Sequence, residues 1–136
     1  YVFNFEYLKK VKKVAIINNE LYYYRITPAS LSNLIDYNRK KMMDQIISRS
    51  SVIESIQNKK ALTMAKKEYL KAVKNAMILL LKSKDCGGTS IRDYTYYKCL
   101  VKDDFSVIDI LRLGAKGIIQ LVLCLYFPFI YSIRKN

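Results

Sequence analysis

The sequence predicts a mostly α-helical protein with one small β element near its N-terminus. Over most of the chain after about residue 34, apolar side chains recur every three or four residues, which is the period of an amphipathic helix. Short runs of β-branched and aromatic residues typical of strands lie before residue 30. Because 51% of the 136 residues are apolar, the chain can form a core and is not a disordered tail. We expect a short helix, a two-strand segment and then four to five helices.

The N-terminal segment is predicted to contain a helix followed by two strands. Residues 1–8 suit the C-terminal part of a short helix, because the lysines after them complement the negative end of its dipole. Residues 14–17 form an apolar run typical of a buried strand, and the Asn-Asn pair that follows suits a tight turn. Residues 21–25 are the second expected strand. Pro28 then predicts a loop, since proline disfavours helix at the residue before it.

Two amphipathic helices come next and are predicted to pack as an antiparallel hairpin, joined at residues 58–60. The first extends to about Gln57, and its apolar stripe consists of Ile35, Met42, Met43, Ile46, Ile53 and Ile56. The second begins near Ala61, and its stripe consists of Leu62, Ala65, Tyr69, Val73, Ala76 and Leu80. The lysines that lie off this second stripe are Lys66, Lys67, Lys71 and Lys74.

The next helices are predicted from a chain break and from capping residues. Residues 85–88 are the clearest break, and Thr89 or Ser90 is expected to cap a helix that continues to about Val101. Asp103 or Asp104 is expected to start another helix, which ends before Gly114. Two further aspartates, Asp36 and Asp85, are also interpreted as helix caps.

Histidine and cysteine content excludes several kinds of site. The chain has no His, which excludes Ser-His-Asp and Cys-His catalysis and every zinc site that needs imidazole. Its three cysteines, Cys86, Cys99 and Cys124, are widely spaced and odd in number, so a reducing compartment is favoured over a disulfide framework. No Cys-x-x-Cys spacing supports a zinc site built from the three thiols.

The net charge is +13, from 24 Lys and Arg against 11 Asp and Glu. Most of the lysines are interpreted as solvated helix faces, because the apolar positions around them keep a helical period. The charge also suits an acidic partner. No nucleic-acid-binding motif is present, so nucleic acid is not favoured as a partner. The positive charge is combined with an apolar C-terminal tail, and this combination favours an anionic membrane.

The tail, residues 117–133, is almost wholly apolar, with Gln120 and Ser132 its clearly polar members. It is shorter than the roughly 20 residues of a membrane-spanning helix, and Pro128 interrupts it. The aromatic residues near its end are typical of the membrane–water interface. We favour an interfacial or shallowly inserted segment; a helix buried in a larger protein and a true span remain alternatives.

The first quarter of the chain carries several short pieces in a characteristic order. An apolar residue and Phe-Asn (residues 2–4) precede a Leu-Lys stretch, a hydrophobic strand ends in Ile-Asn (17–18), a Leu-Tyr-Tyr-Tyr-Arg strand follows (21–25), and a loop ends in Ser-Leu (30–31). In this order and spacing the segment resembles bacterial family-2 glycosyltransferases of capsule, exopolysaccharide and lipopolysaccharide assembly.

The resemblance implies the C-terminal part of an α/β enzyme of the type-A glycosyltransferase fold. Such an enzyme transfers a sugar from a nucleotide-sugar donor, with Mn²⁺ or Mg²⁺ held at an Asp-x-Asp motif and a Glu-Asp pair supplying the general base. The Glu-Asp pair would precede Tyr1, and the sequence contains no Asp-x-Asp; Asp103 and Asp104 are adjacent. The catalytic base and the metal site are therefore expected in a missing N-terminal half, and this segment alone is expected to be inactive and to bind no metal.

Two residues are carried over from the resemblance as substrate-binding candidates, and a third, Tyr24, is added from its place in the Tyr-rich strand. Arg25 matches a basic residue near the donor's pyrophosphate, where a guanidinium suits phosphate oxygens; the alternative is a surface charge at the end of a strand. Ser30 matches a serine that donates to the same phosphates or to the acceptor; the alternative is an ordinary turn residue. Tyr24 is assigned to the acceptor cleft, although a core role is the alternative for most of the tyrosines in its strand.

The predicted organisation has three parts. Residues 1–33 are the end of the catalytic domain, residues 34–115 a helical extension, and residues 116–136 an apolar, membrane-associating tail. The predicted function is transfer of a sugar from a nucleotide-sugar donor to a glycan acceptor in the synthesis of cell-surface polysaccharide. We expect this acceptor to be lipid-linked. The expected location is the cytoplasmic face of the plasma membrane, as a peripheral protein. The alternative is a non-enzymatic basic helical module that binds membrane or nucleic acid.

Overall fold

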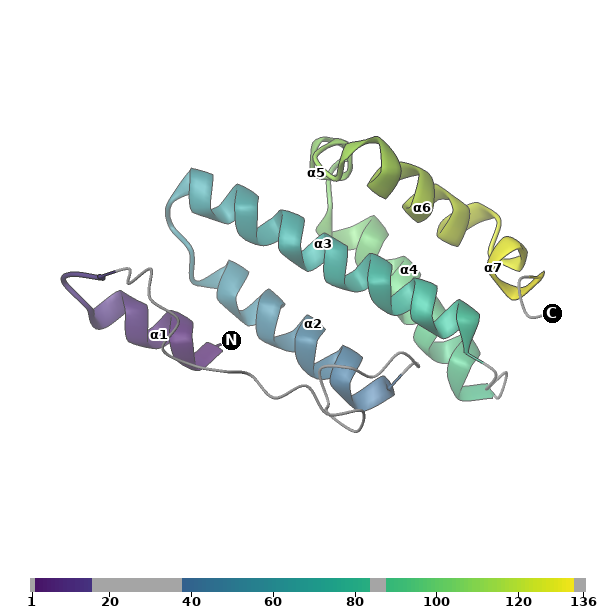
Figure 1. Ribbon diagram of the computed structural model, residues 1–136, viewed down its shortest axis with the longest axis horizontal. Coiled ribbons are helices and arrows are strands. Elements are labelled where there is room, and N and C mark those ends of the chain that lie inside the picture. Colours follow the sequence, from purple (N-terminus) through teal and green to yellow (C-terminus); the bar gives the residue numbers. More distant parts are fainter. Residues whose placement is uncertain (1, 16–37, 84–87, 134–136) are drawn as a thin grey trace.

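The computed structural model describes residues 2–15, 38–83 and 88–133, and this part of the chain is mostly helical (Figure 1). The helices are α1 (Val2–Lys10), α2 (Arg39–Glu54), α3 (Lys59–Lys82), α4 (Gly88–Asp104), α5 (Val107–Leu111), α6 (Gly114–Tyr126) and α7 (Phe129–Ile133). The prediction of a largely helical chain is therefore confirmed, including the short helix at the N-terminus.

The helical hairpin predicted to be joined at residues 58–60 is present as α2 and α3, which pack side by side and antiparallel (Figure 1). An asparagine caps each helix at its N-terminus. The Asn38 side chain accepts a hydrogen bond from the Lys41 N–H at 2.9 Å, and that of Asn58 accepts from the N–H groups of Lys60 and Ala61 at 3.0 Å. Each cap satisfies backbone donors that the first turn leaves open, which fixes where the helix begins.

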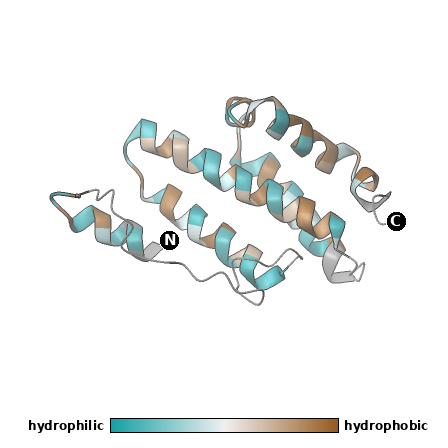
Figure 2. Cartoon of the chain, in the orientation of Figure 1, coloured by the Kyte–Doolittle hydropathy of each residue, from teal (hydrophilic) through white to brown (hydrophobic). Residues whose placement is uncertain are grey.

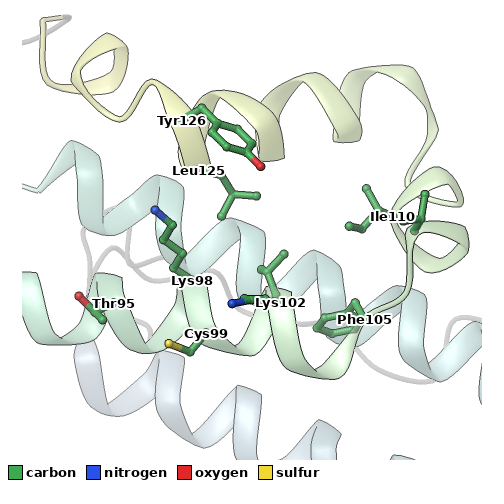
Figure 3. Close-up of a pocket in the computed structure, with 10 residues that line it drawn as sticks. Thr95, Lys98, Cys99, Lys102, Phe105, Ile110, Leu125 and Tyr126 are labelled. Carbon is green, nitrogen blue, oxygen red and sulfur yellow. The ribbon is translucent and has the colours of Figure 1, made fainter.

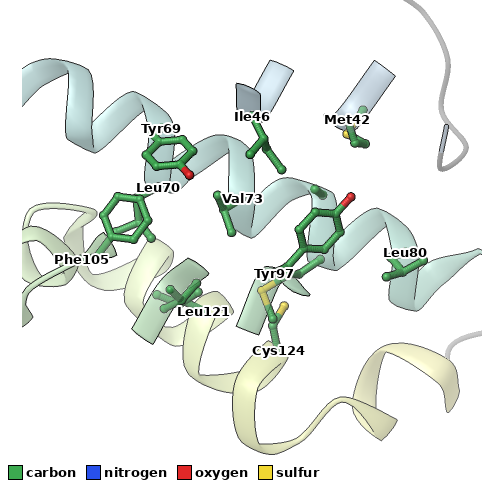
Figure 4. Packing of buried hydrophobic residues seen from close by; sticks show 13 residues of the cluster. Met42, Ile46, Tyr69, Leu70, Val73, Leu80, Tyr97, Phe105, Leu121 and Cys124 are labelled. Atoms are coloured by element: carbon green, nitrogen blue, oxygen red, sulfur yellow. The ribbon is translucent and has the colours of Figure 1, made fainter. Parts of the chain in front are cut away.

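Helix α3 is the centre of the fold, in contact with α2, α4, α5, α6 and α7. Its buried residues include four of the predicted stripe, namely Tyr69, Val73, Ala76 and Leu80, and also Leu70, Ala72 and Met77. The buried surface is wider than one stripe because neighbours pack on more than one side of this helix. Figure 4 shows the resulting core, in which Ile46 of α2, Tyr97 of α4 and Leu121 and Cys124 of α6 gather around α3.

A partly buried ion pair joins the first turn of α2 to α4. The Arg39 Nε donates to both carboxylate oxygens of Asp93 at 2.9 Å, and the Asp93 side chain is only 3% exposed. The guanidinium itself is largely exposed to solvent. The pair connects segments 54 residues apart in the sequence and thereby places the start of α2 against α4.

The predicted starts of α4 and α5 are wrong, whereas α5 ends before Gly114 as expected. Asp103 and Asp104, expected to start a helix, form the last turn of α4, and Thr89 and Ser90 lie within α4, which begins at Gly88. Ser106 caps α5 instead: its hydroxyl accepts from the Asp109 N–H, while the Asp109 carboxylate accepts from the Ser106 N–H. This reciprocal capping box satisfies more backbone groups than a single aspartate would, which explains where α5 begins.

The small β element is not supported by the described residues, which contain no strand. Val14 and Ala15, the first two residues of the first predicted strand, belong to neither a helix nor a strand, and Val14 is 68% exposed rather than buried. No strand among the described residues lies beside them to pair with. The rest of that strand, the strand at residues 21–25 and the loop at Pro28 lie outside the described residues, as do Asp36 and Asp85.

The apolar tail forms two helices rather than one. Pro128 has no N–H to donate and separates α6 from α7, and the last turn of α6 closes with the Phe127 N–H donating to the Leu123 carbonyl at 3.0 Å. At its other end α6 follows a sharp turn in which Gly114 has a φ of +76°, a conformation that favours glycine. Within the described ranges, none of the helices combines the length and the apolar character that crossing a bilayer requires.

Candidate functional site

The three substrate-binding candidates from the sequence, Tyr24, Arg25 and Ser30, lie outside the described residues. The structure therefore neither brings them together nor separates them, and their roles stay predictions. The features that the described residues do place together are a cavity beside α4, α5 and α6 and an apolar surface on α5–α7.

The cavity has a volume of about 420 Å³ and lies where α4 faces α5 and the end of α6 (Figure 3). This volume is within the range of roughly 300–1,000 Å³ of small-molecule pockets. Its walls are mainly apolar and consist of Val101, Phe105, Val107, Ile110, Leu125 and Tyr126. Helix α4 supplies one wall, and the capping box of α5 directs the chain back so that α6 supplies the opposite one.

Two lysines give the cavity a positive charge. Lys98 and Lys102 are one turn apart on α4 and both line the cavity, and Figure 3 shows the Lys98 side chain extending from α4 toward Leu125 and Tyr126 of α6. Both lysines are exposed, and neither forms an ion pair with another described residue. The described residues that line the cavity include no carboxylate. An apolar space with two available ammonium groups suits a ligand that has an apolar body and an anionic end.

The opposite wall is held in place by a hydrogen bond from α4. The Tyr94 hydroxyl donates to the Cys124 carbonyl of α6 at 2.7 Å. Burial raises the pKa of the Tyr94 hydroxyl, which keeps it protonated as a donor. Burial likewise raises the pKa of the Cys124 thiol to about 11, so this thiol is protonated and unreactive at neutral pH. Cys99, by contrast, is exposed and lines the cavity.

Helix α6 carries apolar side chains on both its inner and its outer face. Leu121 and Cys124 point inward and are buried. The outer side chains, Ile119, Val122 and Tyr126, are spaced three and four residues apart on one face and are exposed by 59%, 39% and 71%. Gln120, the one strongly polar side chain between residues 117 and 126, accepts a hydrogen bond from Lys74 of α3 at 2.6 Å. The Gln120 side chain of α6 is thus hydrogen-bonded to α3.

Further exposed apolar residues flank α6 in the chain. Figure 2 shows that α6 is largely hydrophobic along its length, whereas α3 alternates between hydrophilic and hydrophobic residues. The exposed apolar residues of α5, α7 and the turn before α7 are Val107, Ile108, Leu111, Phe127, Phe129 and Ile130. Contiguous patches of exposed apolar groups are typical of interaction surfaces, whereas isolated ones are ordinary.

The carboxylate of Asp109 is a buried charge within α5. Burial acts to raise its pKa, but hydrogen bonds from Ser106 and the charges of Lys66 and Arg112 outweigh burial and hold the pKa below its usual value. Arg112 Nη1 lies 3.1 Å from the carboxylate. The charges around Asp109 therefore stabilise the turn that leads from α4 into α6.

No group of three His, Cys, Asp or Glu side chains in the described ranges is arranged to hold a metal ion. The metal implied by the sequence resemblance belongs to residues expected before Tyr1, so it stays a prediction about that region.

Sequence reasoning identified the apolar tail but missed the cavity. Its walls come from residues 95 to 126, and the spacing of α4 alone does not reveal which of its side chains face α6. One signal was available: Lys98 and Lys102 are four residues apart and therefore share a helix face with Thr95 and Cys99. No family model matches the sequence, and comparisons with curated proteins and with solved structures find no similar chain.

Proposed function

We propose that α5–α7 bind the surface of an anionic membrane, and that the chain belongs to a protein that transfers sugar to a lipid-linked acceptor at that surface. The observation that carries the membrane proposal is the outer face of α6. Its side chains Ile119, Val122 and Tyr126 are apolar and exposed, while the polar Gln120 is bonded inward to Lys74. Burying such a face removes apolar area from water, which contributes about 25 cal/mol per Å².

Length and residue type favour an interfacial position. Helix α6 has 13 residues and is about 20 Å long, against about 30 Å for the hydrocarbon core of a bilayer. Tyr126, Phe127 and Phe129 follow at its C-terminal end, and amphipathic aromatic rings favour the level of the lipid headgroups. A helix lying in the plane of the interface would bury its outer face by roughly 5–10 Å.

Charge complementarity favours an anionic lipid surface. Lys116 is exposed in the first turn of α6, and Lys98 and Lys102 are exposed on the adjacent α4. Each cation near an anionic membrane contributes about 1 kcal/mol. A second copy of this chain would present the same positive charge, so an anionic surface is the occupant that suits this face.

The sugar-transfer part of the proposal rests on the resemblance of residues 1–32 to family-2 glycosyltransferases. In this proposal Arg25 and Ser30 contact the donor phosphates, Tyr24 the acceptor, and a divalent metal binds outside this segment. The reading frame 5′ of the codon for Tyr1 tests it: we expect a Glu-Asp pair immediately upstream and an Asp-x-Asp further upstream. In a protein with that half, Arg25→Ala should reduce turnover about tenfold or more without unfolding. An upstream sequence without these motifs would contradict sugar transfer and leave membrane binding unaffected.

Co-sedimentation with vesicles tests the membrane proposal. The chain should bind vesicles of phosphatidylglycerol and phosphatidylcholine, bind pure phosphatidylcholine more weakly, and lose affinity as salt is raised to about 0.5 M. Ile119→Ser/Val122→Ser should weaken binding about tenfold or more, because each side chain loses about 1 kcal/mol of apolar burial.

The matched control is Ile47→Ser/Met64→Ser, which removes two similarly exposed apolar side chains from α2 and α3. This control should bind vesicles as the unmodified chain does. Equal loss in both double variants would contradict a role for the α6 face. Salt-dependent binding to RNA or DNA without binding to vesicles would favour the nucleic-acid alternative, and self-association abolished by Ile119→Ser/Val122→Ser would assign the face to a second copy.

A further inference from the structure

We propose that the cavity beside α4, α5 and α6 binds one apolar chain of an anionic lipid, with its phosphate held by Lys98 and Lys102. This inference rests on the proposed membrane function, because the lipid is taken from the surface to which α5–α7 bind. It goes further by assigning a second, separate site that selects a single lipid molecule.

The first argument is the chemistry of the cavity. Its walls are formed by aliphatic and aromatic side chains, and its polar groups are those of Thr95, Cys99, the Tyr126 hydroxyl and the two lysines. The Thr95 hydroxyl is already used, since it donates to the Ile91 carbonyl at 2.9 Å. The lysines are the charged groups available to an anionic ligand atom, and the exposed Tyr126 hydroxyl is a neutral donor. A phosphate with an attached hydrocarbon chain matches both parts of the cavity, whereas a sugar would meet too few polar partners.

The second argument is position. Val107 and Tyr126 line the cavity and are also among the most exposed apolar residues of the described chain, at 73% and 71%. The cavity is thus continuous with the exposed apolar residues of α5–α7. A lipid chain leaving the bilayer could pass from that surface into the cavity without crossing water.

The exposed thiol of Cys99 provides a direct measurement of occupancy. Cys99 lines the cavity, while Cys124 is buried and its thiol is protonated. The probe is decyl phosphate, kept below its micelle concentration and below any concentration at which Cys124 becomes modified. Alkylation of Cys99 by N-ethylmaleimide is followed by peptide mass spectrometry in the absence of vesicles. We expect decyl phosphate to slow alkylation at least tenfold at saturation.

Two further probes distinguish the contribution of the hydrocarbon chain of the lipid from that of its phosphate head group. Decyl maltoside has the same chain without a charge and should require at least a tenfold higher concentration for the same protection. Inorganic phosphate has the charge without the chain and should give no protection. Equal protection by decyl phosphate and decyl maltoside would overturn the proposal, since the cavity would then not select an anionic lipid. Protection by inorganic phosphate would overturn the role of the apolar walls.

Variants test the residues. Lys98→Gln/Lys102→Gln should raise the concentration of decyl phosphate that gives half-maximal protection at least tenfold and leave that of decyl maltoside unchanged. The matched control, Lys12→Gln/Lys13→Gln, removes two exposed charges from the segment after α1 and should leave both unchanged. Equal effects of the two double variants would reject a specific phosphate site.

Two other variants separate this proposal from membrane binding. Thr95→Phe places a larger side chain into the cavity from an exposed position on α4, and it should abolish protection by decyl phosphate while vesicle binding is retained. Ile119→Ser/Val122→Ser should weaken vesicle binding and leave protection by decyl phosphate unchanged, because neither residue lines the cavity. Absence of vesicle binding by the unmodified chain, with its protection by decyl phosphate intact, would contradict the proposed function alone, and unchanged protection in Thr95→Phe would contradict the cavity site alone.

Discussion

Helices α3 and α6 both pack an apolar face into the core, but their outer faces differ. Where α3 is not covered it carries polar and charged residues such as Lys67, Lys71 and Asn75, whereas the outer face of α6 carries Ile119, Val122 and Tyr126. Apart from Met64, the uncovered part of α3 is therefore suited to contact with water. The outer face of α6 exposes apolar area in the described structure, which is unfavourable unless something else covers it. The comparison indicates that α3 has a role in the fold alone, whereas α6 in our proposal also forms an interface.

The largest expected effect compares the two faces of α6 directly. Leu121 is 1% exposed and Ile119 is 59% exposed, so Leu121→Ala should lower the free energy of unfolding by roughly 2–5 kcal/mol and Ile119→Ala by about 0.5 kcal/mol or less. Urea unfolding followed by circular dichroism measures both. Similar losses would mean that the outer face of α6 is packed against protein in solution, and the comparison with α3 would fail.

An intermediate effect is expected at the capping box that turns the chain toward α6. The pKa of Asp109 is lowered in the folded protein, so its contribution to stability is present above about pH 3.9 and is lost as the pH falls through the folded pKa. Asp109→Asn should cost about 1–2 kcal/mol at pH 7, and the variant should lose this part of the acid dependence. Urea midpoints between pH 7 and pH 3 measure it.

The control for this acid dependence is Asp103→Asn, which changes an exposed carboxylate at the end of α4. It should unfold with the same pH dependence as the unmodified chain. If Asp103→Asn and Asp109→Asn flattened the profile equally, the acid dependence would come from overall charge, and the α5 turn would not be the element that holds α6 in place.

The smallest expected effect concerns the contact between α4 and α6. Tyr94→Phe removes the hydroxyl that donates to the Cys124 carbonyl and should cost about 0.5–1.5 kcal/mol. Tyr96→Phe, at a more exposed neighbouring tyrosine, is the matched control and should be nearly neutral. Urea unfolding measures both variants, and faster alkylation of Cys124 in Tyr94→Phe would show that α6 has loosened. Equal stability of the two variants would mean that the Tyr94 hydrogen bond does not help to hold α6 in place.

Periodicity predicted the inner faces well and the helix ends poorly. Tyr69, Val73, Ala76 and Leu80 are buried as expected, because an apolar stripe on one helix face needs a partner wherever that partner comes from. The additional burial of Leu70 and Met77 depends on several helices meeting at α3, which spacing within one segment does not reveal. The start of α5 was misplaced because the reciprocal bonds of Ser106 and Asp109 define it.

The candidate cavity, too, could be predicted only in part from the sequence. Lys98 and Lys102 share a helix face in any α-helix, so the sequence contains the charged half of the site. The apolar half requires Leu125 and Tyr126 to return to α4 after two changes of direction, at the α5 capping box and at Gly114. Such a meeting of distant segments depends on turn geometry and tertiary packing, neither of which local patterns specify.

The central position of α3 determines how the protein should open. Because five other helices contact it, the amide hydrogens in the middle of α3 can exchange with solvent only when the whole bundle comes apart. The main contacts of α1 are with α2, so its amides can exchange through a local opening that leaves the rest intact. The chain should thus show two tiers of hydrogen exchange, with the slowest amides in the helix that every later helix touches.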